Sequence, residues 1–458
     1  NGVTLTGTGE AGASIVVTFQ GQQQTTTVAG DGSWSVNYAA SSIAAGTYSS
    51  DFSVVSTDAA GNSTTSTHTV TVDTETTASV NGPIAGDNVI NGTEQSAGVT
   101  LTGTAEAGST VVVTLGAASH TVTANASGNW SSVFHSFEIP TGIASLQAQA
   151  VSTDLAGNTT TTASSTVAVD TSTYASISSN SAGVDNTVNQ SESQAGVTFT
   201  GTSEANATIT VSVGGILRTT TADASGNWSA LYESGSLTGE YGTTVTVTAQ
   251  DAAGNQFTST AIPLAIDTLV NEPVIELVND NAAHTYYDIS TAGGTDTYTA
   301  NTLETNGTVG GSISGTPFAG GTMTNFAFGT PVSDGTHLVV TAADTAGNSS
   351  STLLLHDQGG TEAGATNHVG LSQFNIDAIE LGFSDNVDLT LNEADIKALS
   401  NNSDTVTIHG GTDDKVNILG AVDTNANQTI DGDLYNVYTI GTDGTTLIIE
   451  DDIVVSVI

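Results

Sequence analysis

One pentapeptide recurs along this chain of 458 residues, and its spacing constrains the fold more than any other feature. It reads DAAGN at 58–62, DLAGN at 154–158, DAAGN at 251–255 and DTAGN at 344–348. Three other markers keep the same order: segments like GVTLTGTGEAG, a Trp in segments like SGNWSS, and an apolar strand ending in Asp-Thr. A period of roughly one hundred residues is too long for a solenoid, so each copy should have its own core.

Strands are the expected secondary structure. Thr, Val and Ala are frequent, and segments such as TVVVTL and TVTVTA alternate in polarity as strands do. Short alternating strands at this spacing predict an all-β chain of tandem immunoglobulin-like or fibronectin-like β-sandwiches with a C-terminal β-rich domain. We expect Trp34, Trp130 and Trp228 to pack between the sheets rather than to stack on a ligand. In the second repeat, seven strands are expected near Ala78–Asn81, Val99–Gly103, Thr110–Leu115, His120–Ala124, Trp130–Phe134, Ser145–Ser152 and Thr160–Val169.

The markers also divide the chain into five predicted domains. The first lacks the opening strand and the upstream acid of the pattern, and the fourth keeps only DTAGN and STLLLHD. After the Gly-rich stretch at 356–368, the sequence changes character. The expected domains are an incomplete Ig-like domain at 1–74, Ig-like domains at 75–171 and 172–268, a divergent Ig-like domain at 269–356, and a C-terminal β-rich domain at 357–458.

Charge is the second constraint. The chain has 46 acidic residues against three basic ones, so its formal net charge is −43. Nucleic acid and anionic membrane are therefore improbable partners, and a divalent cation is an obvious counter-charge. Halophilic solubility is the alternative explanation. The chain has no Cys, which leaves bound metal as a substitute for disulfides, and no apolar run is long enough for a transmembrane helix.

Strand parity places several acids at the same end of a domain. If successive strands of the second repeat are antiparallel, strands two, four and six return to the end at which the chain enters. The loops after strands two and six contain Glu106 and Asp154, and the chain enters on Asp73. The same argument groups Asp170, Glu204 and Asp251 at the next junction, and Asp267 with Asp344 at the one after. In the first repeat, Glu10 and Asp58 would form an incomplete site.

Three converging carboxylates need a counter-charge, and oxygen ligands in flexible geometry suit Ca²⁺ better than Mg²⁺. The sequence therefore predicts calcium sites at the domain junctions. The simpler interpretation is that D-x-A-G-N is only a tight turn in which Asp and Asn cap their own backbone. Asp87, Asn91 and Glu94, with Asp185 and Glu192, lie in the opposite long loops and could add ligands at the far end.

The repeat markers resemble the bacterial Ig-like domains of very large surface adhesins exported by type I secretion, the BapA-like and RTX-adhesin group. The segments that carry this resemblance are GVTLTGTGEAG, GNW, DAAGN and VTVDT. The resemblance covers residues 1–267 and extends more weakly to about 356. It implies Ca²⁺ at the domain junctions, where Asp73, Glu106, Asp154 and their counterparts would bind it and stiffen an extender. It also implies a secreted protein at the bacterial cell surface.

The last hundred residues resemble the β-rich region near the C-terminus of such adhesins. The nonapeptide GGxGxDxUx is not repeated, and GGTDDKVNI at 410–418 is one degenerate copy, so a full RTX β-roll is not expected. NEADIKALS predicts one helix, capped by Asn392. DTNANQTID at 423–431 resembles the start of an EF-hand loop, but Gln428 and Leu434 replace its Gly and Glu, which favours an Asx-rich hairpin turn.

We do not expect an enzyme, because the sequence contains no G-x-S-x-G, H-E-x-x-H or P-loop motif. The leading hypothesis is a calcium-stiffened extracellular segment of a bacterial adhesin that mediates attachment or biofilm formation. Its receptor could be a cell surface, a glycan or an abiotic surface. The alternatives are a self-assembling surface-layer or filament subunit, and a carbohydrate-binding module within 268–458. Self-association is a possible interaction; nucleic-acid binding and membrane insertion are not expected.

Overall fold

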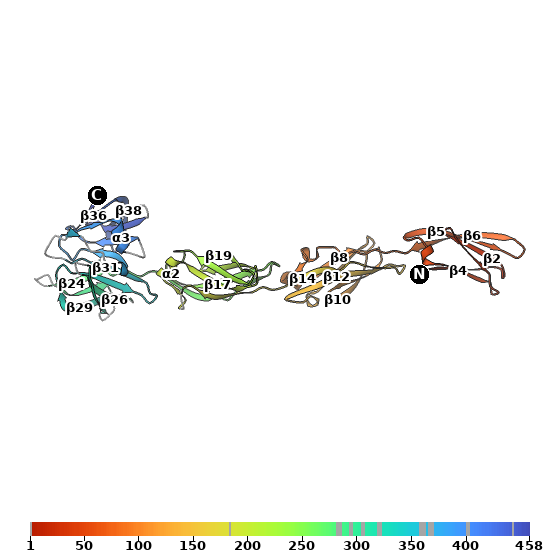
Figure 1. Cartoon of the computed structure of the whole chain (residues 1–458), viewed down its shortest axis with the longest axis horizontal. Helices are drawn as coiled ribbons and strands as arrows, with labels where there is room; N and C mark the ends of the chain where they lie inside the picture. The colour runs from red at the N-terminus through yellow and green to blue at the C-terminus, as the bar shows by residue number, and fades with distance from the viewer. Residues whose placement is uncertain are drawn as a thin grey trace. The chain divides into compact units, whose positions relative to one another are not determined.

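A computed structural model describes residues 2–182, 185–280, 286–292, 296–303, 307–317, 323–356, 363–364, 371–399, 404–441 and 444–458. The chain divides into two compact units. Unit 1 contains residues 1–174 together with 249–257, and unit 2 contains residues 175–248 and 258–458. The described part is almost entirely β-structure, which confirms the predicted fold class (Figure 1). Within it, no helix is both long and apolar enough to cross a membrane.

The first repeat, in unit 1, forms a two-layer sandwich. One layer pairs β1 (Val3–Thr8) with β4 (Ser33–Tyr38), and the other has the order β3-β2-β5-β6. The second layer consists of β3 (Gln22–Thr27), β2 (Ser14–Phe19), β5 (Thr47–Thr57) and β6 (Ser63–Asp73). In β2 and β4, every second side chain is buried, so both layers contribute alternate residues to one core.

The second repeat is more complete. β8 (Val99–Thr104) pairs with β11 (Asn129–Phe134), and the larger sheet has the order β10-β9-β12-β14-β7. Its strands are β10 (Ala118–Thr123), β9 (Thr110–Leu115), β12 (Ile143–Thr153), β14 (Ser165–Asp170) and β7 (Val89–Ile90), with β13 (Thr159–Thr161) beside β12.

Two predictions for this repeat differ from the structure. The strand expected at Ala78–Asn81 is reduced to an isolated bridge between Ala78 and Ala105, and the last expected strand is divided into β13 and β14. The helix α1 (Gly92–Ala97) was not predicted, although its signal is present. Asn91 and Glu94 form a capping box, which is the usual start signal of a helix.

The third repeat has the same plan. β15 (Ala175–Asn180), β17 (Val197–Ser203) and β20 (Asn227–Tyr232) form one sheet, and the other has the order β16-β23-β21-β18-β19. Its strands are β16 (Thr187–Val188), β23 (Ile262–Asp267), β21 (Glu240–Gln250), β18 (Thr208–Val213) and β19 (Ile216–Thr221), with β22 (Gln256–Thr258) beside β21. A second short helix, α2 (Gln190–Ala195), begins at the capping box of Asn189 and Glu192.

In the rest of unit 2, one sheet of nine strands runs across the expected boundary at 356/357. Its order is β27-β26-β30-β31-β33-β35-β39-β38-β37. These strands are β27 (Val309–Ser314), β26 (Thr297–Leu303), β30 (His337–Ala343), β31 (Ser349–Leu354), β33 (Ile376–Glu380), β35 (Thr405–His409), β39 (Thr445–Glu450), β38 (Asp433–Ile440) and β37 (Ala421–Ile430). A further sheet has the order β24-β25-β29-β28, formed by β24 (Ile275–Asp280), β25 (Tyr286–Ala292), β29 (Met323–Val332) and β28 (Thr316–Pro317).

From β31 to β39 the pairing is parallel, and the chain alternates between the large sheet and a second parallel sheet. The second sheet consists of β32 (Ala363–Gly364), β34 (Asp388–Leu391), β36 (Lys415–Ile418) and β40 (Val454–Val457). The C-terminal residues therefore coil between two sheets, and GGTDD at 410–414 forms one turn of the coil. The predicted helix is α3 (Glu393–Leu399), and Asn392 Oδ1 accepts hydrogen bonds from the N–H groups of Ala394 and Asp395, which confirms the cap.

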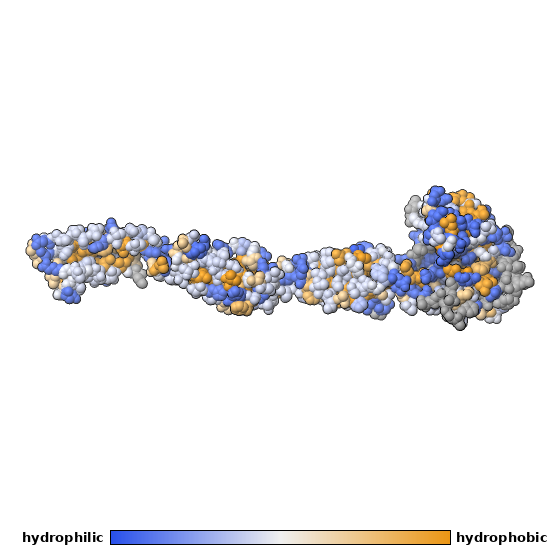
Figure 2. All heavy atoms as spheres, turned by 180° about the vertical axis from the view of Figure 1, so that it is seen from behind, coloured by the Kyte–Doolittle hydropathy of each residue, from blue (hydrophilic) through white to orange (hydrophobic). Residues whose placement is uncertain are grey.

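The three Trp side chains lie in the sandwich cores, as predicted. Trp130 and Trp228 are 3% exposed and Trp34 is 9% exposed. Each ring covers a Gly of the neighbouring strand, such as Gly103 beside Trp130, where a side chain would collide with it. Outside the cores, Figure 2 shows repeats covered mainly by side chains of intermediate hydropathy, with small hydrophobic groups between them. This pattern reflects exposed strands such as β6, which is rich in Thr and Ser.

Candidate metal centre at the domain junctions

Three carboxylates of unit 1 meet where the first repeat ends and the second begins. Asp73 ends β6, Glu106 follows β8, and Asp154 follows β12. One carboxylate oxygen of each residue lies within 4.8 Å of the other two. β12 pairs antiparallel with β9, and Thr153 lies opposite Thr110, so the loop after β12 lies beside the turn that leads from β8 into β9. Asp154 is buried, and Asp73 and Glu106 are partly buried, so three negative charges share a site shielded from water.

The loop from Asp154 to Asn158 folds on itself to hold the aspartate. The Asn158 backbone N–H donates to Asp154 Oδ1, and its Nδ2 donates to Asp154 Oδ2, both at 2.8 Å. Gly157 has φ 92°, a left-handed conformation that favours glycine. Burial raises the pKa of Asp154, but the hydrogen bonds from Asn158, Gly157 and Ala156 outweigh it and hold the pKa below its ordinary value. The tight-turn interpretation thus describes how the loop folds, and the turn presents an ionised carboxylate.

The second junction repeats part of this arrangement. Asp170 ends β14, and Asp251, which follows β21, is 8% exposed. Asn255 Nδ2 donates to Asp251 Oδ2 at 2.7 Å and to the Asp170 carbonyl at 2.9 Å. Burial and the charge of Asp251 raise the pKa of Asp170. Glu204 lies in unit 2, in the turn after β17 that corresponds to the turn of Glu106 after β8.

At the third junction, within unit 2, Asp267 ends β23 and Asp344 follows β30. Burial raises the pKa of Asp267, and the charges of Asp344, Glu240 and Asp296 raise it further. The last two acids were not predicted as site residues. Glu240 lies opposite Asp267 in the pairing of β21 with β23, so only the strand register reveals it. Asp296 immediately precedes β26, in a repeat whose markers are weak.

In the first repeat, Asp58 makes the same contacts to Asn62 that Asp154 makes to Asn158. These hydrogen bonds lower the pKa of Asp58. Glu10 lies in the turn between β1 and β2. Among the described residues, Glu10 and Asp58 do not belong to a group of three carboxylates like that of the next repeat. The prediction of an incomplete site here stays a prediction.

Among the described residues, the basic side chains have other contacts than these carboxylates. Lys397 bonds Glu393 at 2.8 Å, Lys415 lies 3.6 Å from Asp388, and Arg218 lies over the Tyr232 ring. These are the three basic residues of the chain. Buried carboxylates that repel one another are unfavourable unless a cation or hydrogen bonds compensate.

The donor atoms of the first junction fit a hard divalent cation. They are all oxygens, which Ca²⁺ prefers, and they come from three separate segments. The linkers add a further observation: the Thr76 and Thr173 hydroxyls are buried without a hydrogen-bond partner in the described structure. Each lies three residues after the aspartate that ends its strand, Asp73 or Asp170. A buried hydroxyl that recurs without a partner at one position adds an oxygen donor to each linker.

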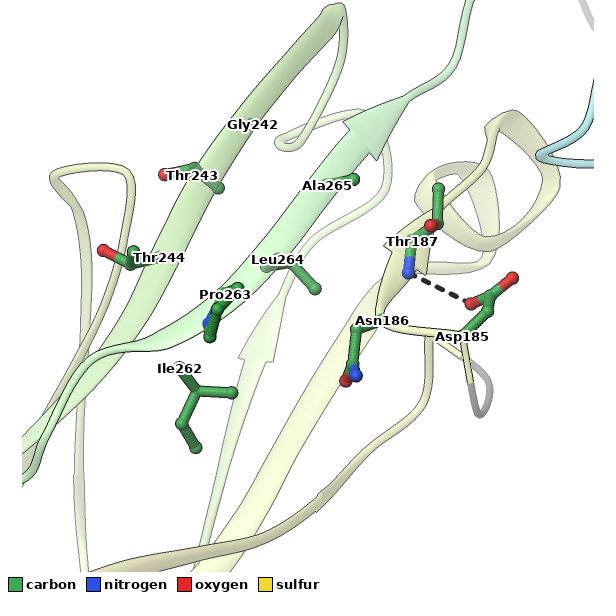
Figure 3. A pocket seen from close by; sticks show the side chains of 10 residues that line it. All are labelled: Asp185, Asn186, Thr187, Gly242, Thr243, Thr244, Ile262, Pro263, Leu264 and Ala265. Carbon is green, nitrogen blue, oxygen red and sulfur yellow. Dashed lines mark hydrogen bonds between the residues drawn. The ribbon is translucent and has the colours of Figure 1, made fainter.

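The acids of the opposite loops have local roles. Asp87 Oδ1 accepts the Val89 N–H, and Asp185 Oδ1 accepts the Thr187 N–H. Figure 3 shows Asp185 turned toward Thr187 at a shallow hollow beside β23. Glu94 and Glu192 complete the capping boxes of α1 and α2. Each of these carboxylates therefore has a hydrogen-bonding role within its own loop.

The EF-hand-like segment at 423–431 lies in β37 and the turn after it. Its Asp423 accepts the N–H of Asn425, which has φ 55° at an irregularity of the strand pairing. The segment is therefore a distorted strand in a hairpin with β38, without the flanking helices of an EF-hand.

A separate polar cluster surrounds His409 in the C-terminal coil. His409 lies opposite Glu380 in the parallel pairing of β33 with β35. Its Nε2 is 3.4 Å from Glu272 Oε1, and its Nδ1 is 2.8 Å from the Tyr435 hydroxyl. Burial lowers the pKa of His409, but the carboxylates of Glu272, Glu380 and Glu450 outweigh it and raise the pKa above its ordinary value.

This cluster predicts that unit 2 loses stability as pH rises. A His whose folded pKa is raised stabilises the fold fully below its unfolded pKa of about 6.5, and the contribution is lost as pH rises through the folded value. Calorimetric unfolding of the full chain between about pH 6 and pH 9 should show one transition that weakens with pH in this way. In His409→Gln, which keeps a polar contact to Tyr435, that transition should vary less with pH. The same pH dependence in both proteins would contradict the assignment.

Comparisons with known proteins agree with the repeat structure. Residues 2–74 and 173–268 match the bacterial Ig-like domain family. A solved structure described as a Ca²⁺-stabilised adhesin of an Antarctic bacterium that binds ice is 30% identical, covering 78% of this chain and 94% of that one, with a TM-score of 0.33. A 1.5-MDa bacterial ice-binding adhesin is 29% identical over 58% of this chain and 91% of its own, also with a TM-score of 0.33.

A tetra-tandem repeat from the extending region of a large adhesion protein is 21% identical over 76% of this chain and 93% of its own, with a TM-score of 0.30. No curated protein matches the chain. Because all three TM-scores are low, the family match and the sequence identity carry the assignment. The chain belongs to the bacterial Ig-like domain family, whose domains it carries in tandem.

Proposed function

We propose that this chain is a calcium-stiffened extracellular segment of a bacterial surface adhesin, in which cations at the junctions restrict the motion of successive domains. The observation that carries the proposal is the grouping of Asp73, Glu106 and Asp154 within 4.8 Å. Asp73 ends the first repeat, whereas Glu106 and Asp154 belong to the second. A cation held by all three would connect the two repeats and neutralise their repulsion.

Calcium is the cation that the site favours. Ca²⁺ accepts six to eight oxygens in flexible geometry, whereas Mg²⁺ requires a stricter octahedron and retains water. Asp73, Glu106 and Asp154 would supply carboxylate oxygens, and backbone carbonyls and water would complete the shell. At the second junction the corresponding ligands within unit 1 would be Asp170 and Asp251. At the third they would be Asp267 and Asp344, with Asp296 and Glu240 nearby.

An extracellular location is consistent with this chemistry. Ca²⁺ sites of extracellular modules are tuned to concentrations of about 10⁻⁴ to 10⁻³ M, far above cytosolic levels. The chain has no cysteine, so cations would take the role that disulfides have in many secreted domains. Similarity to an adhesin described as Ca²⁺-stabilised supports the same assignment.

The proposed contribution of the chain to adhesion is mechanical. A series of Ig-like domains with ordered junctions would hold a binding region away from the cell, which serves attachment or biofilm formation. The contacted surface, whether a cell, a glycan or an abiotic material, would be recognised elsewhere or by the divergent domain. The charge of −43 makes an anionic receptor unfavourable unless cations intervene.

The test compares the full chain in Ca²⁺, in Mg²⁺ and in chelator. Ca²⁺ should raise the unfolding temperature and should narrow the range of dimensions seen in small-angle X-ray scattering, because a cation held by Asp73, Glu106 and Asp154 would connect the first repeat to the second. Mg²⁺ at the same concentration should have a smaller effect. Identical melting and scattering in Ca²⁺ and chelator would exclude the proposal. Ordered sheets or fibres on adding Ca²⁺ would instead indicate a surface-layer or filament subunit.

A further inference from the structure

The fifth residue of D-x-A-G-N contacts the preceding repeat as well as its own loop. We call Asn158, Asn255 and Asn348 the junction asparagines. Each side chain donates from Nδ2 to the aspartate of its own loop and to the aspartate that ends the last strand of the preceding repeat. From the sequence, this residue is expected only as part of a turn.

Asn348, in unit 2, uses both the donor and the acceptor atom of its side-chain amide. Its Nδ2 donates to Asp344 Oδ2 at 2.6 Å, to the Asp267 carbonyl at 2.8 Å and to Asp267 Oδ1 at 3.2 Å. Its Oδ1 accepts the backbone N–H of Gln190 at 2.6 Å. A neighbouring contact, from Asn189 Nδ2 to the Ala346 carbonyl at 3.1 Å, joins the same two segments. Asn348 is 3% exposed, so these bonds are shielded from water.

Gln190 is the first residue of α2, where a helix has backbone N–H groups without partners inside the helix. Asn189 caps this helix through Glu192 N, and Asn348 supplies the acceptor for Gln190 N. Asn348, a residue of the fourth repeat, therefore completes the cap of a helix in the third.

The same geometry occurs in unit 1. Asn255 Nδ2 donates to Asp251 and to the Asp170 carbonyl, and its Oδ1 accepts the N–H of Gly92 at 2.8 Å. Gly92 is the first residue of α1, as Gln190 is of α2. Two independent junctions thus place one amide between a strand-end aspartate, a loop aspartate and a helix start.

Only an amide satisfies all three groups. The two aspartates each accept a hydrogen bond and the helix start donates one, so the bridging side chain must supply two donor hydrogens and one acceptor. A carboxylate of the same shape would keep the acceptor but lose the donors, and it would add a charge beside two like charges. The hydrogen bonds from the amide also offset the repulsion between Asp267 and Asp344 that raises the pKa of Asp267.

We propose that Asn255 and Asn348 are positioning residues that hold their junctions in register without a cation. The first repeat has the same loop geometry, since the backbone N–H and Nδ2 of Asn62 both donate to Asp58. A cation at these junctions neutralises carboxylates that the amide has already brought together. The functional importance of Asn255 and Asn348 rests on the proposed function, in which the chain contributes to adhesion through ordered domain junctions.

The test measures the third junction in chelator. The chain has no native cysteine, so Thr219→Cys and Ser312→Cys, both at exposed positions, can carry spin labels in the third and fourth repeats of the full chain. Pulsed electron paramagnetic resonance reports the distribution of distances between them. In chelator, the distribution should be narrow with Asn348 present and broad in Asn348→Ala. Each charge-assisted hydrogen bond lost should raise the open population about tenfold.

Two controls separate positioning from folding. Asn348→Asp should broaden the distribution in chelator, and added Ca²⁺ should narrow it again, because the new carboxylate can bind the cation. Asn62→Ala, which removes only contacts within its own loop, should leave the distribution unchanged. The unfolding transitions of the third and fourth repeats should be retained in all variants.

A distribution in Asn348→Ala that equals the parent in chelator would overturn the inference. A different result tests the proposed function. If Ca²⁺ does not narrow the distance distribution of any variant, the calcium proposal fails, but the role of Asn348 is unaffected.

Discussion

Asp154→Ala is expected to weaken calcium binding at the first junction by about a hundredfold or more. Mutating a residue that only supports a metal ligand already lowers metal affinity by about ten- to a hundredfold, and Asp154 would be a ligand itself. Asp154 is the buried member of the group with Asp73 and Glu106, and its oxygens are fixed by Asn158. Its removal leaves two partly buried carboxylates with fewer ligands than Ca²⁺ requires. Isothermal titration calorimetry of the full chain should show one class of calcium site fewer in this variant than in the parent. The dimensions of the chain in saturating Ca²⁺ should become more variable.

Asp31→Ala is the matched control. Asp31 also accepts hydrogen bonds in a turn, from the backbone N–H and hydroxyl of Ser33, but it belongs to no group of three carboxylates among the described residues. Calcium stoichiometry should be unchanged in this variant. Equal effects of Asp31→Ala and Asp154→Ala would indicate that both acids act only as turn caps.

The position of the candidate site followed from the sequence because strand parity is a local property. Alternating residues identify the strands, and counting antiparallel strands indicates which loops share an end. Asp73, Glu106 and Asp154 could be grouped this way without knowing any distance. Glu106 and Asp154 lie at the same end as long as an even number of strands separates their loops.

Glu240 and Asn348 could not be found by the same reasoning. Glu240 acts through its register opposite Asp267, which depends on how β21 and β23 pair. Asn348 acts through contacts to Gln190 and Asp267, more than 80 residues away in the sequence. Such contacts appear only when two folded repeats are placed side by side, so a pattern within one repeat does not contain them.

The C-terminal coil was missed for a different reason. Parallel strands are joined by long connections, so neighbours in the sheet are distant in the sequence. Glu380 lies opposite His409 although 28 residues separate them, and no fixed period marks the turns. The nonapeptide that would signal a coil occurs once at most, at 410–418. Parallel pairing here depends on apolar runs such as TVTIH and TTLIIE, which also fit antiparallel strands.

The junction amides and the proposed cations have different electrostatic roles: the amides hold the carboxylates together, and the cations would neutralise them. Hydrogen bonds from Asn255 and Asn348 hold two aspartates together at each junction. Burial raises the pKa of Asp170 and Asp267, and the like charges beside them raise it further. A raised carboxyl pKa means that the charged form is disfavoured in the fold. The junctions therefore hold carboxylates that repel one another, and a bound cation would remove this repulsion. Because the ligands are already assembled, little of the binding free energy would be needed to bring them together.

Trp130→Ala is expected to destabilise the second repeat by about 3–5 kcal/mol, the usual cost of removing a buried aromatic side chain. Trp130 is 3% exposed and covers Gly103 on the neighbouring strand, so its removal leaves a cavity between the sheets. Such a loss is a large fraction of the stability of a domain of this size, and urea unfolding should show one transition moved to much lower denaturant.

Trp130→Phe separates packing from hydrogen bonding. The Trp130 indole N–H is buried without a partner in the described structure, so Phe removes an unsatisfied donor while keeping most of the ring. Its cost should therefore be clearly smaller than that of Trp130→Ala. If Trp130→Ala left the unfolding transition in place but abolished binding of a glycan or other ligand, this side chain would be a recognition residue, and the Trp marker of the repeats would have to be reassigned from core to surface.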